Sequence, residues 1–204
     1  MVLSVSEIFP SFQGEGINTG LPTTFIRLAG CNLNCLWCDT PYALDTEQGD
    51  EMDIPEIMAV VREIGIDRIC LTGGEPLVQE EALTLVEMLI HEGFKVDLET
   101  NGSFDISRYT EFGSDIMISM DIKTPSSGED GSTLMENLNK MRSIDQIKFI
   151  VKDKKDMEFT FKFLLSSRPD CTVILTPVDN KGGDLIAERL MDFIRNKIPF
   201  PGSD

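Results

Sequence analysis

The sequence is poor in histidine, tryptophan and basic residues, and these shortages exclude several classes of function. Its 204 residues include one histidine, one tryptophan, and 18 Lys and Arg against 35 Asp and Glu, which gives a formal net charge of −17. That charge opposes a sequence-independent grip on phosphate backbones, so we expect no direct nucleic-acid partner. The single histidine, His91, lies near the end of a predicted helix and is assigned no role.

Long apolar runs are missing from the sequence as well. No apolar stretch approaches the ~20 residues that span a bilayer, and residues 1–7 lack the basic region and apolar run of a signal peptide. We therefore expect a cytoplasmic protein with no membrane partner. The length and the 41% hydrophobic content are sufficient for a real core, so residues 1–204 are predicted to form a single domain.

Three of the five cysteines are clustered, because Cys31, Cys35 and Cys38 fall within eight residues. The spacing Cys-x3-Cys-x2-Cys cannot place all three on one face of a helix or strand, so we expect a loop that wraps a small object. Thiolates are the ligands that iron-sulfur clusters require, and three of them leave one iron of a 4Fe-4S cluster open. An open iron can bind an exchangeable ligand, as the radical chemistry of S-adenosylmethionine (SAM) requires. The clustered thiols also favour a reducing compartment.

Zinc binding and chance spacing stay open as weaker explanations of these cysteines. A structural zinc site normally takes four Cys or His ligands in two separated pairs, and the only histidine lies far along the chain. Disulfides would leave an odd thiol. The remaining cysteines, Cys70 inside an apolar run and Cys171 just before another, are interpreted as small buried hydrophobic residues.

Six predicted strands recur about every 20 to 45 residues, and helical patterns separate several of them. Right-handed crossovers between such strands imply a parallel sheet, and six units are too few for the eight-stranded closed barrel. The predicted fold class is therefore α/β, in the form of an open partial (β/α)6 barrel. A capping box, Asp53-Ile-Pro-Glu56, is predicted to start a helix that ends at Gly65. The predicted strands cover residues 23–28, 68–72, 95–100, 116–121, 146–151 and 172–177, with further helices near 83–90, 157–165 and 185–198; residues 1–22 precede the first convincing strand.

Polar and glycine-rich residues gather where these strands end, which is where parallel α/β folds place their chemistry. Gly73-Gly74 allows backbone to approach a ligand closely, although a tight turn explains it as well. Arg27, a charge inside the first strand, is either a salt-bridged strand arginine or a clamp for a carboxylate. Trp37 either shields the cluster and stacks on adenine or simply packs. The polar stretch 124–132 is predicted to be a solvated connection. The strand-end segments are the cysteine loop, Gly73-Gly-Glu-Pro76, Glu99-Thr-Asn-Gly102, Ser119-Met-Asp-Ile-Lys123 and Thr176-Pro-Val-Asp179.

With these motifs the chain resembles a radical SAM enzyme, and specifically the 7-carboxy-7-deazaguanine synthase family. The resemblance implies a partial barrel of the radical SAM type and a homodimeric carbon-nitrogen lyase. The lyase would convert 6-carboxy-5,6,7,8-tetrahydropterin into 7-carboxy-7-deazaguanine and ammonia, a step towards the 7-deazapurine bases of modified tRNA. An electron donor such as flavodoxin or ferredoxin would reduce the cluster, and a 5′-deoxyadenosyl radical would remove a substrate hydrogen. The general signs are Cys31-x3-Cys35-x2-Cys38 and Gly73-Gly-Glu-Pro76; the specific signs are Phe12-Gln-Gly-Glu-Gly16, its spacing to Arg27, Cys38-Asp-Thr40 and Glu99-Thr-Asn-Gly102.

The same resemblance implies roles for individual residues. It assigns the 4Fe-4S cluster to Cys31, Cys35 and Cys38, Mg²⁺ to Thr40, the pterin to Phe12, Gln13, Gly14, Arg27 and Thr72, and SAM to Trp37, Asp39, Gly74, Ser119, Asp121, Lys123, Thr176, Pro177, Val178 and Asp179. Mg²⁺ is a hard cation that keeps mostly water and substrate oxygens as ligands, which agrees with Thr40 as its single protein ligand. Family members often have Ser-Pro-Lys where this chain has Ser119-Met-Asp-Ile-Lys123, and this chain continues past Pro201, where some relatives end in a proline whose carboxylate lies at the substrate.

Two other functions fit part of the pattern. A radical SAM activase, which forms a glycyl radical on a partner protein, would share the cysteines and Gly73-Gly-Glu-Pro76 but not the Gln13-Gly-Glu-Gly16 turn. A non-catalytic iron-sulfur carrier or zinc-binding module would need only the cysteine loop.

Overall fold

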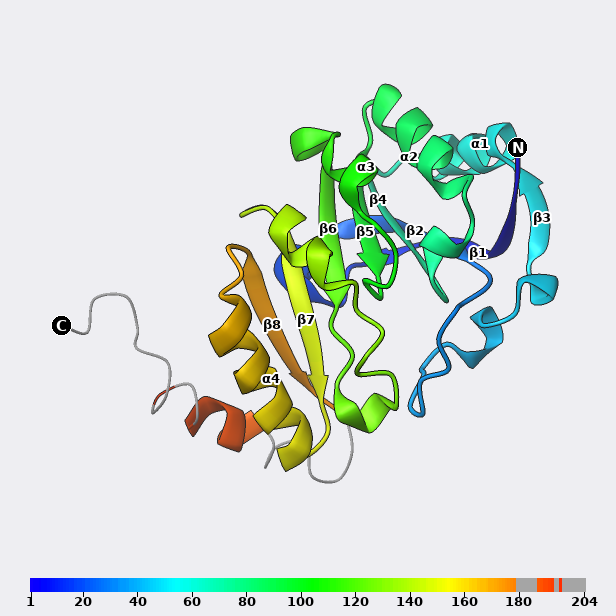
Figure 1. The fold of residues 1–204 in the computed structure, drawn as a ribbon. Coiled ribbons are helices and arrows are strands. Elements are labelled where there is room, and N and C mark those ends of the chain that lie inside the picture. Colours follow the sequence, from blue (N-terminus) through cyan, green and yellow to red (C-terminus); the bar gives the residue numbers. More distant parts are fainter. Residues whose placement is uncertain (179–186, 193–194, 196–204) are drawn as a thin grey trace.

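The described residues of this computed structural model, 1–178, 187–192 and 195, form one eight-stranded sheet in the order β3-β1-β2-β4-β5-β6-β7-β8 (Figure 1). Six of its strands are parallel neighbours: β2 (Pro22–Leu28), β4 (Arg68–Gly73), β5 (Lys95–Thr100), β6 (Ile116–Asp121), β7 (Gln146–Val151) and β8 (Thr172–Pro177). They correspond to the six predicted strands. Within the described residues β3 and β8 are free edges, so the sheet is not closed, and the open partial barrel is confirmed.

Four helices connect the strands: α1 (Ile54–Ile64), α2 (Ala82–His91), α3 (Ser107–Thr110) and α4 (Lys154–Ser167). The predicted capping box starts α1, because Asp53 accepts from the Glu56 N–H and Glu56 accepts from the Asp53 N–H, both at 2.8 Å. Gly65 ends the helix in the left-handed conformation, with φ of 71°. The predicted helix 185–198 lies partly outside the described residues, of which 187–192 and 195 are helical.

The prediction that no strand precedes residue 23 is wrong. Strand β1 (Val2–Phe12) pairs antiparallel with β2, and β3 (Asp50–Asp53) pairs antiparallel with β1. Only the first residues of β1 show the alternation of a half-buried strand, and the remainder, which mixes apolar and polar residues, is held by pairing with β2. The β1–β2 connection is a turn over residues 13–21, called here the hairpin turn, which is closed by backbone hydrogen bonds between Gln13 and Leu21 and between Gly20 and Gln13.

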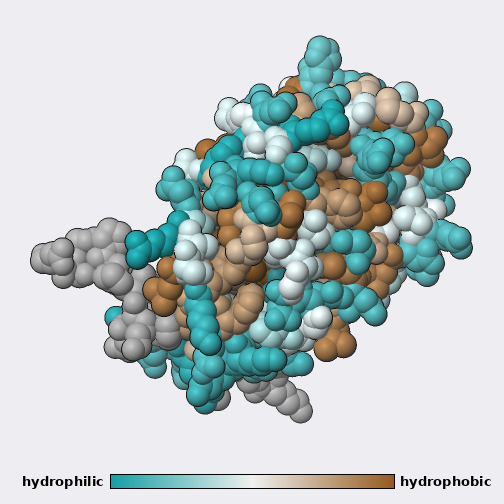
Figure 2. All heavy atoms as spheres, viewed as in Figure 1, coloured by the Kyte–Doolittle hydropathy of each residue, from teal (hydrophilic) through white to brown (hydrophobic). Residues whose placement is uncertain are grey.

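The two faces of the parallel sheet carry different side chains. One face is apolar and packs against the helices, with Leu71, Leu98, Ile118 and Phe149 fully buried there. Burial of each such side chain contributes about 1.5–3 kcal/mol to the stability of the fold. Because successive strand residues alternate between faces, the neighbouring polar residues point to the other side, into the partial barrel. Figure 2 shows that hydrophilic residues dominate the surface in this view, with apolar residues gathered near its centre. No helix among the described residues is long and apolar enough to cross a membrane.

Candidate functional site

A cavity of about 550 Å³ opens among residues at the carboxyl ends of the parallel strands, a volume that suits a small-molecule ligand. Phe12 does not line it and is 68% exposed, and Asp179 lies outside the described residues. The other predicted site residues all line this cavity, namely Gln13, Gly14, Arg27, Cys31, Cys35, Trp37, Cys38, Asp39, Thr40, Thr72, Gly74, Ser119, Asp121, Lys123, Thr176, Pro177 and Val178.

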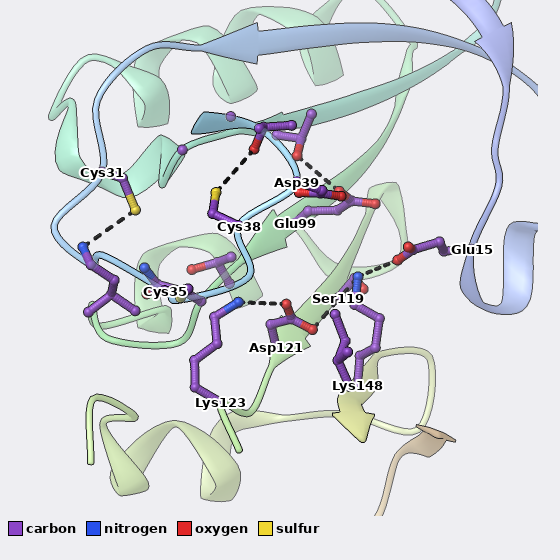
Figure 3. Close-up of a pocket in the computed structure, with 18 of the residues that line it drawn as sticks. Glu15, Cys31, Cys35, Cys38, Asp39, Glu99, Ser119, Asp121, Lys123 and Lys148 are labelled. Atoms are coloured by element: carbon purple, nitrogen blue, oxygen red, sulfur yellow. Dashed lines mark hydrogen bonds and ion pairs between the residues drawn. The ribbon is translucent and has the colours of Figure 1, made fainter. Parts of the chain in front are cut away.

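The cysteine loop forms one wall of the cavity. Cys31, Cys35 and Cys38 are all free thiols of intermediate exposure (Figure 3). The loop is anchored by a backbone hydrogen bond of 3.0 Å from the Cys31 N–H to the Leu44 carbonyl. Burial raises the pKa of Cys31 and Cys35. A metal centre that binds their thiolates must therefore displace these protons.

The donor set fits a 4Fe-4S cluster better than a single metal ion. Within the described part of the chain, no three His, Cys, Asp or Glu side chains converge on one ion. A cluster does not require such convergence, because each cysteine binds a different iron, whereas structural zinc needs four donors around one ion. Among the described residues that line the cavity, Cys31, Cys35 and Cys38 are the only Cys or His side chains. The chain thus offers ligands for three irons and leaves the fourth iron open to another ligand.

The Gly73-Gly74 turn packs directly against the cysteine loop. A Cβ on Gly74 would lie 2.4 Å from the Gly30 carbonyl oxygen, 2.6 Å from the Ala43 carbonyl oxygen and 2.8 Å from Cys31 Cβ. Real Cβ atoms do not approach other atoms so closely, so only glycine fits here. At Gly74 the absence of a side chain is thus required by packing against the cysteine loop, and the close approach to a ligand stays a prediction.

Glu75 is a fully buried carboxylate that ties the end of β4 to the end of β5. It accepts hydrogen bonds from the Asn101 N–H at 2.6 Å, the Thr100 hydroxyl at 2.8 Å and the Leu77 N–H at 3.1 Å. Burial raises the pKa of Glu75 to about 7, although these donors oppose the rise. The ends of these two strands are thus joined through one buried side chain.

The stretch 124–132 braces the cysteine loop, and the prediction of a solvated connection is wrong for its first part. Ser127 is fully buried, and its carbonyl oxygen accepts a backbone hydrogen bond from the cysteine loop at 2.9 Å. Trp37 Nε1 donates to Ser126 Oγ at 3.1 Å, and Ser126 Oγ donates to Asp156 at 2.6 Å. Asp156 is itself fully buried in α4. The indole is therefore held from a helix more than a hundred residues away in the sequence.

A row of alternating charges crosses the cavity floor (Figure 3). Lys123 donates to Asp121 at 2.8 Å, Lys148 lies 3.7 Å from the other oxygen of Asp121, and Lys148 also pairs with Glu15. Burial alone would raise the pKa of Asp121, but the two ammonium groups outweigh it and lower that pKa. Burial would likewise lower the pKa of Lys123, and the charge of Asp121 raises it instead. Asp121 and Lys123 are therefore both charged around neutral pH.

A second polar group lines the opposite part of the cavity. Arg27 donates from Nε to Glu7 at 2.7 Å and still lines the cavity, so the two alternatives considered for it, strand salt bridge and clamp, are compatible. Glu99 accepts from the Thr72 hydroxyl at 2.9 Å and from Gln13 Nε2 at 3.4 Å. These contacts fix a carboxylate with donors on both sides.

Comparison with known proteins identifies the family. Residues 25–163 match the family model described as the radical SAM superfamily, which is more than half of the chain. The chain belongs to the radical SAM superfamily. It is 37% identical over 187 residues to the 7-carboxy-7-deazaguanine synthase of Thermoplasma acidophilum, covering 92% of this chain and 88% of the relative. It is 39% identical over 177 residues to the synthase of the same name from Methanospirillum hungatei, covering 86% and 73%.

These relatives place this radical SAM chain in the 7-carboxy-7-deazaguanine synthase family, as the resemblance predicted. The crystal structure of QueE from Escherichia coli is similar with a TM-score of 0.77 and 24% identity, over 94% of this chain and 91% of that chain, and confirms the fold. Membership of the radical SAM superfamily implies a 4Fe-4S cluster and SAM as cofactors.

Three charged residues of the radical SAM cavity were not predicted as site residues: Glu15, Glu99 and Lys148. Lys148 offered one signal, since it is a charge inside the otherwise apolar stretch 147–151. Glu99 belongs to the motif Glu99-Thr-Asn-Gly102 and Glu15 to the glycine turn Gln13-Gly-Glu-Gly16, and neither pattern by itself shows which side chain the carboxylate contacts.

Proposed function

We propose that this radical SAM chain converts 6-carboxy-5,6,7,8-tetrahydropterin into 7-carboxy-7-deazaguanine with release of ammonia. The observation that carries the proposal is one cavity with two unlike parts, a three-cysteine wall and a facing group of Arg27, Thr72 and Glu99. The names of the relatives that match most of the chain support the same reaction. The product would serve the biosynthesis of 7-deazapurine bases such as those of queuosine or archaeosine.

In the cofactor part, the chain would hold the cluster through its three cysteines and SAM through the strand ends beside them. When bound, these groups supply a carbon radical that removes a hydrogen atom from the substrate. Ser119, Asp121 and Lys123 offer a hydroxyl, a carboxylate and an ammonium for the ribose and the amino-acid end of SAM. Residues that would enclose the rest of SAM are Trp37, Asp39, Gly74, Thr176, Pro177 and Val178, and Asp179 stays a prediction outside the described residues.

In the substrate part, charged donors and acceptors would orient the pterin. Arg27 donates a hydrogen bond from Nε to Glu7, which leaves the terminal guanidinium nitrogens for the substrate carboxylate. Glu99, fixed by Thr72 and Gln13, is placed to accept from ring N–H groups. Gly14 leaves room beside them, since a Cβ there would meet nothing within 4 Å. Phe12 stays a prediction, and its exposed side chain gives it no role inside the cavity.

We also propose that Mg²⁺ joins the substrate through Thr40. The Thr40 hydroxyl lines the cavity and lies 3.8 Å from the Cys38 sulfur, so a cation there would sit beside the cluster loop. One hydroxyl ligand suits a small hard cation that keeps water and takes the remaining oxygens from the substrate.

The resemblance further supports a single-domain, cytoplasmic homodimer that receives electrons from a flavodoxin or ferredoxin. Size-exclusion chromatography with light scattering tests the oligomeric state, and a monomer at working concentration would contradict that part of the proposal.

An anaerobic assay tests the reaction. Reconstituted protein, SAM, Mg²⁺ and a reductant are incubated with 6-carboxy-5,6,7,8-tetrahydropterin, and mass spectrometry is expected to find 7-carboxy-7-deazaguanine. Cys35→Ala should abolish the product, while Cys171→Ala, distant from the cavity lining, should retain it.

Three outcomes would overturn the proposal. Release of 5′-deoxyadenosine with the pterin unchanged indicates a different substrate. A glycyl radical on an added protein indicates an activase. No 5′-deoxyadenosine from fully loaded protein indicates a non-catalytic iron-sulfur protein.

A further inference from the structure

Lys148 is a buried lysine in the middle of the sheet that no sequence motif marked. Its residue is 8% exposed, and it projects from β7 into the cavity, whereas its strand neighbours Ile147 and Phe149 are fully buried on the helix side. A buried ammonium is costly unless it is paired. Lys148 is paired on two sides, by Glu15 of the hairpin turn and by Asp121 of β6.

The hairpin turn enters the partial barrel and is held there by inward-pointing side chains of several strands. The Ile17 N–H donates to Gln146 Oε1 at 2.9 Å, and Asn18 Nδ2 donates to both carboxylate oxygens of Asp97, at 3.0 and 2.9 Å. These two contacts fix the deep part of the turn, at the sheet end away from the cysteine loop. They do not by themselves fix Gln13 and Gly14, which line the cavity.

The Glu15–Lys148 pair holds the cavity side of the turn together with the backbone hydrogen bonds of Gln13 and the hydrogen bond from Gln13 Nε2 to Glu99. Glu15 is the one charged residue of segment 13–21, so the turn carries a single ionic contact with the barrel. The side chain of Glu15 is 47% exposed and that of Lys148 is 10% exposed. Burial would lower the pKa of Lys148, but Asp121, Glu99 and Glu15 outweigh it and raise that pKa. The lysine therefore stays charged and keeps its hold on Glu15 across the physiological range.

Removal of Lys148 should affect its two partners, Asp121 and Glu15, differently. Lys123 holds the opposite oxygen of Asp121 at 2.8 Å, so Asp121 keeps one cation when Lys148 is removed. Glu15 pairs with no second cation among the described residues, so it would lose its anchor. Removal of the Lys148 charge should thus loosen the turn, while Asp121, which is assigned to SAM, keeps the shorter of its two ion pairs.

We propose that Lys148 is a positioning residue for the substrate, which holds Glu15 so that Gln13 and Gly14 of the hairpin turn form the substrate wall of the cavity. This inference rests on the proposed function for its kinetic consequence, but not for its structural one. Lys148 acts through the turn, which is why its loss should change substrate affinity more than SAM affinity.

The first test needs no ligand and no activity. Hydrogen exchange of residues 13–21 is measured in Lys148→Met, Glu15→Gln, Lys148→Arg and the control Lys162→Met, whose lysine is exposed on α4. Lys148→Met and Glu15→Gln are expected to speed exchange in the turn by about tenfold, a modest effect because half of the pair is exposed to solvent. Lys148→Arg should restore part of the protection, and Lys162→Met should match the wild type. Exchange of the β4 and β5 amides reports whether each variant is folded.

The second test is kinetic. Lys148→Met should raise KM for the carboxypterin by about tenfold, equivalent to about 1.4 kcal/mol, and leave KM for SAM and substrate-free release of 5′-deoxyadenosine within about twofold. Combining Lys148→Met with Glu15→Gln should add little to either single change, because both remove one pair.

The outcomes separate this inference from the proposed function. Unchanged exchange in the turn of folded Lys148→Met, or equal rises in both KM values, overturns the role of Lys148. Faster exchange in a protein whose wild type makes no deazaguanine upholds the anchor and overturns the proposed reaction instead.

Discussion

Replacing Gly74 by alanine is expected to displace the cysteine loop. The added Cβ would meet the Gly30 and Ala43 carbonyl oxygens at 2.4 and 2.6 Å, whereas ordinary contact begins at 3.4 Å. About 1 Å of relief is needed, and both obstacles are backbone atoms that no side-chain rotation can move. Overpacking costs about 1–3 kcal/mol, and a backbone obstacle argues for the upper part of that range.

Two measurements follow from this displacement. For a chain of this size about 2–3 kcal/mol lowers Tm by roughly 4–12 °C, which circular dichroism of the metal-free protein would detect. Iron and sulfide bound after anaerobic reconstitution should fall well below the wild-type content, since Cys31 Cβ is the third atom in contact. Gly131→Ala is the matched control, because a Cβ at Gly131 meets nothing within 4 Å, and it should change neither quantity.

The two measurements together can refute the reasoning. If Gly74→Ala keeps both the wild-type Tm and the wild-type iron content, the turn does not pack against the cysteine loop as described. If only Tm falls, the strain is absorbed by the sheet, and the inferred coupling to the cluster site is wrong.

Three further predictions concern contacts outside the hairpin turn. Ser126→Ala removes the partner of the Trp37 indole, so the single-tryptophan emission should shift to longer wavelength and KM for SAM should rise about fivefold, as for one hydrogen bond of about 1 kcal/mol; an unchanged spectrum would contradict the contact. The folded-state pKa of Glu75, about 7, lies above its ordinary 4.5, so its contribution to stability is present below about pH 4.5 and is lost as pH rises through 7. Urea unfolding of metal-free protein should therefore show a loss between pH 5 and 8 that is about 2–3 kcal/mol larger in wild type than in Glu75→Gln, and parallel pH profiles would disprove it. Arg142→Met leaves the fully buried Asp145 without its cation and should cost about 3–5 kcal/mol in the free energy of unfolding, while the iron content of the folded fraction stays at the wild-type level; a loss of iron in folded protein would contradict this separation.

The local sequence pattern was sufficient to predict the six parallel strands of the sheet. The central strands are short apolar runs or, in β5, an alternation of polar and apolar residues, and α1 carries its start and stop signals in Asp53, Glu56 and Gly65. The cysteine spacing likewise gave the cluster wall without any tertiary information. These features are readable because their determinants lie within a few residues of one another.

The remainder depends on contacts between segments far apart in the sequence. Strand β1 mixes apolar and polar residues and contains Pro10, and pairing with β2 and β3 makes it a strand. Glu15 and Lys148 are 133 residues apart, and Trp37 and Ser126 are 89 apart. The periodicity of a segment does not indicate which distant segment it contacts. These pairs can therefore be identified only from the folded sheet.

The span of the cavity lining, from Gln13 to Val178, bears on how the protein is made. The cysteines leave the ribosome early, but the opposite wall belongs to β7 and β8, which follow more than a hundred residues later. At about 5–20 residues per second the nascent thiols would wait for roughly 7–30 s before that wall exists. Iron and sulfide can therefore meet the complete pocket only after β8 has been made.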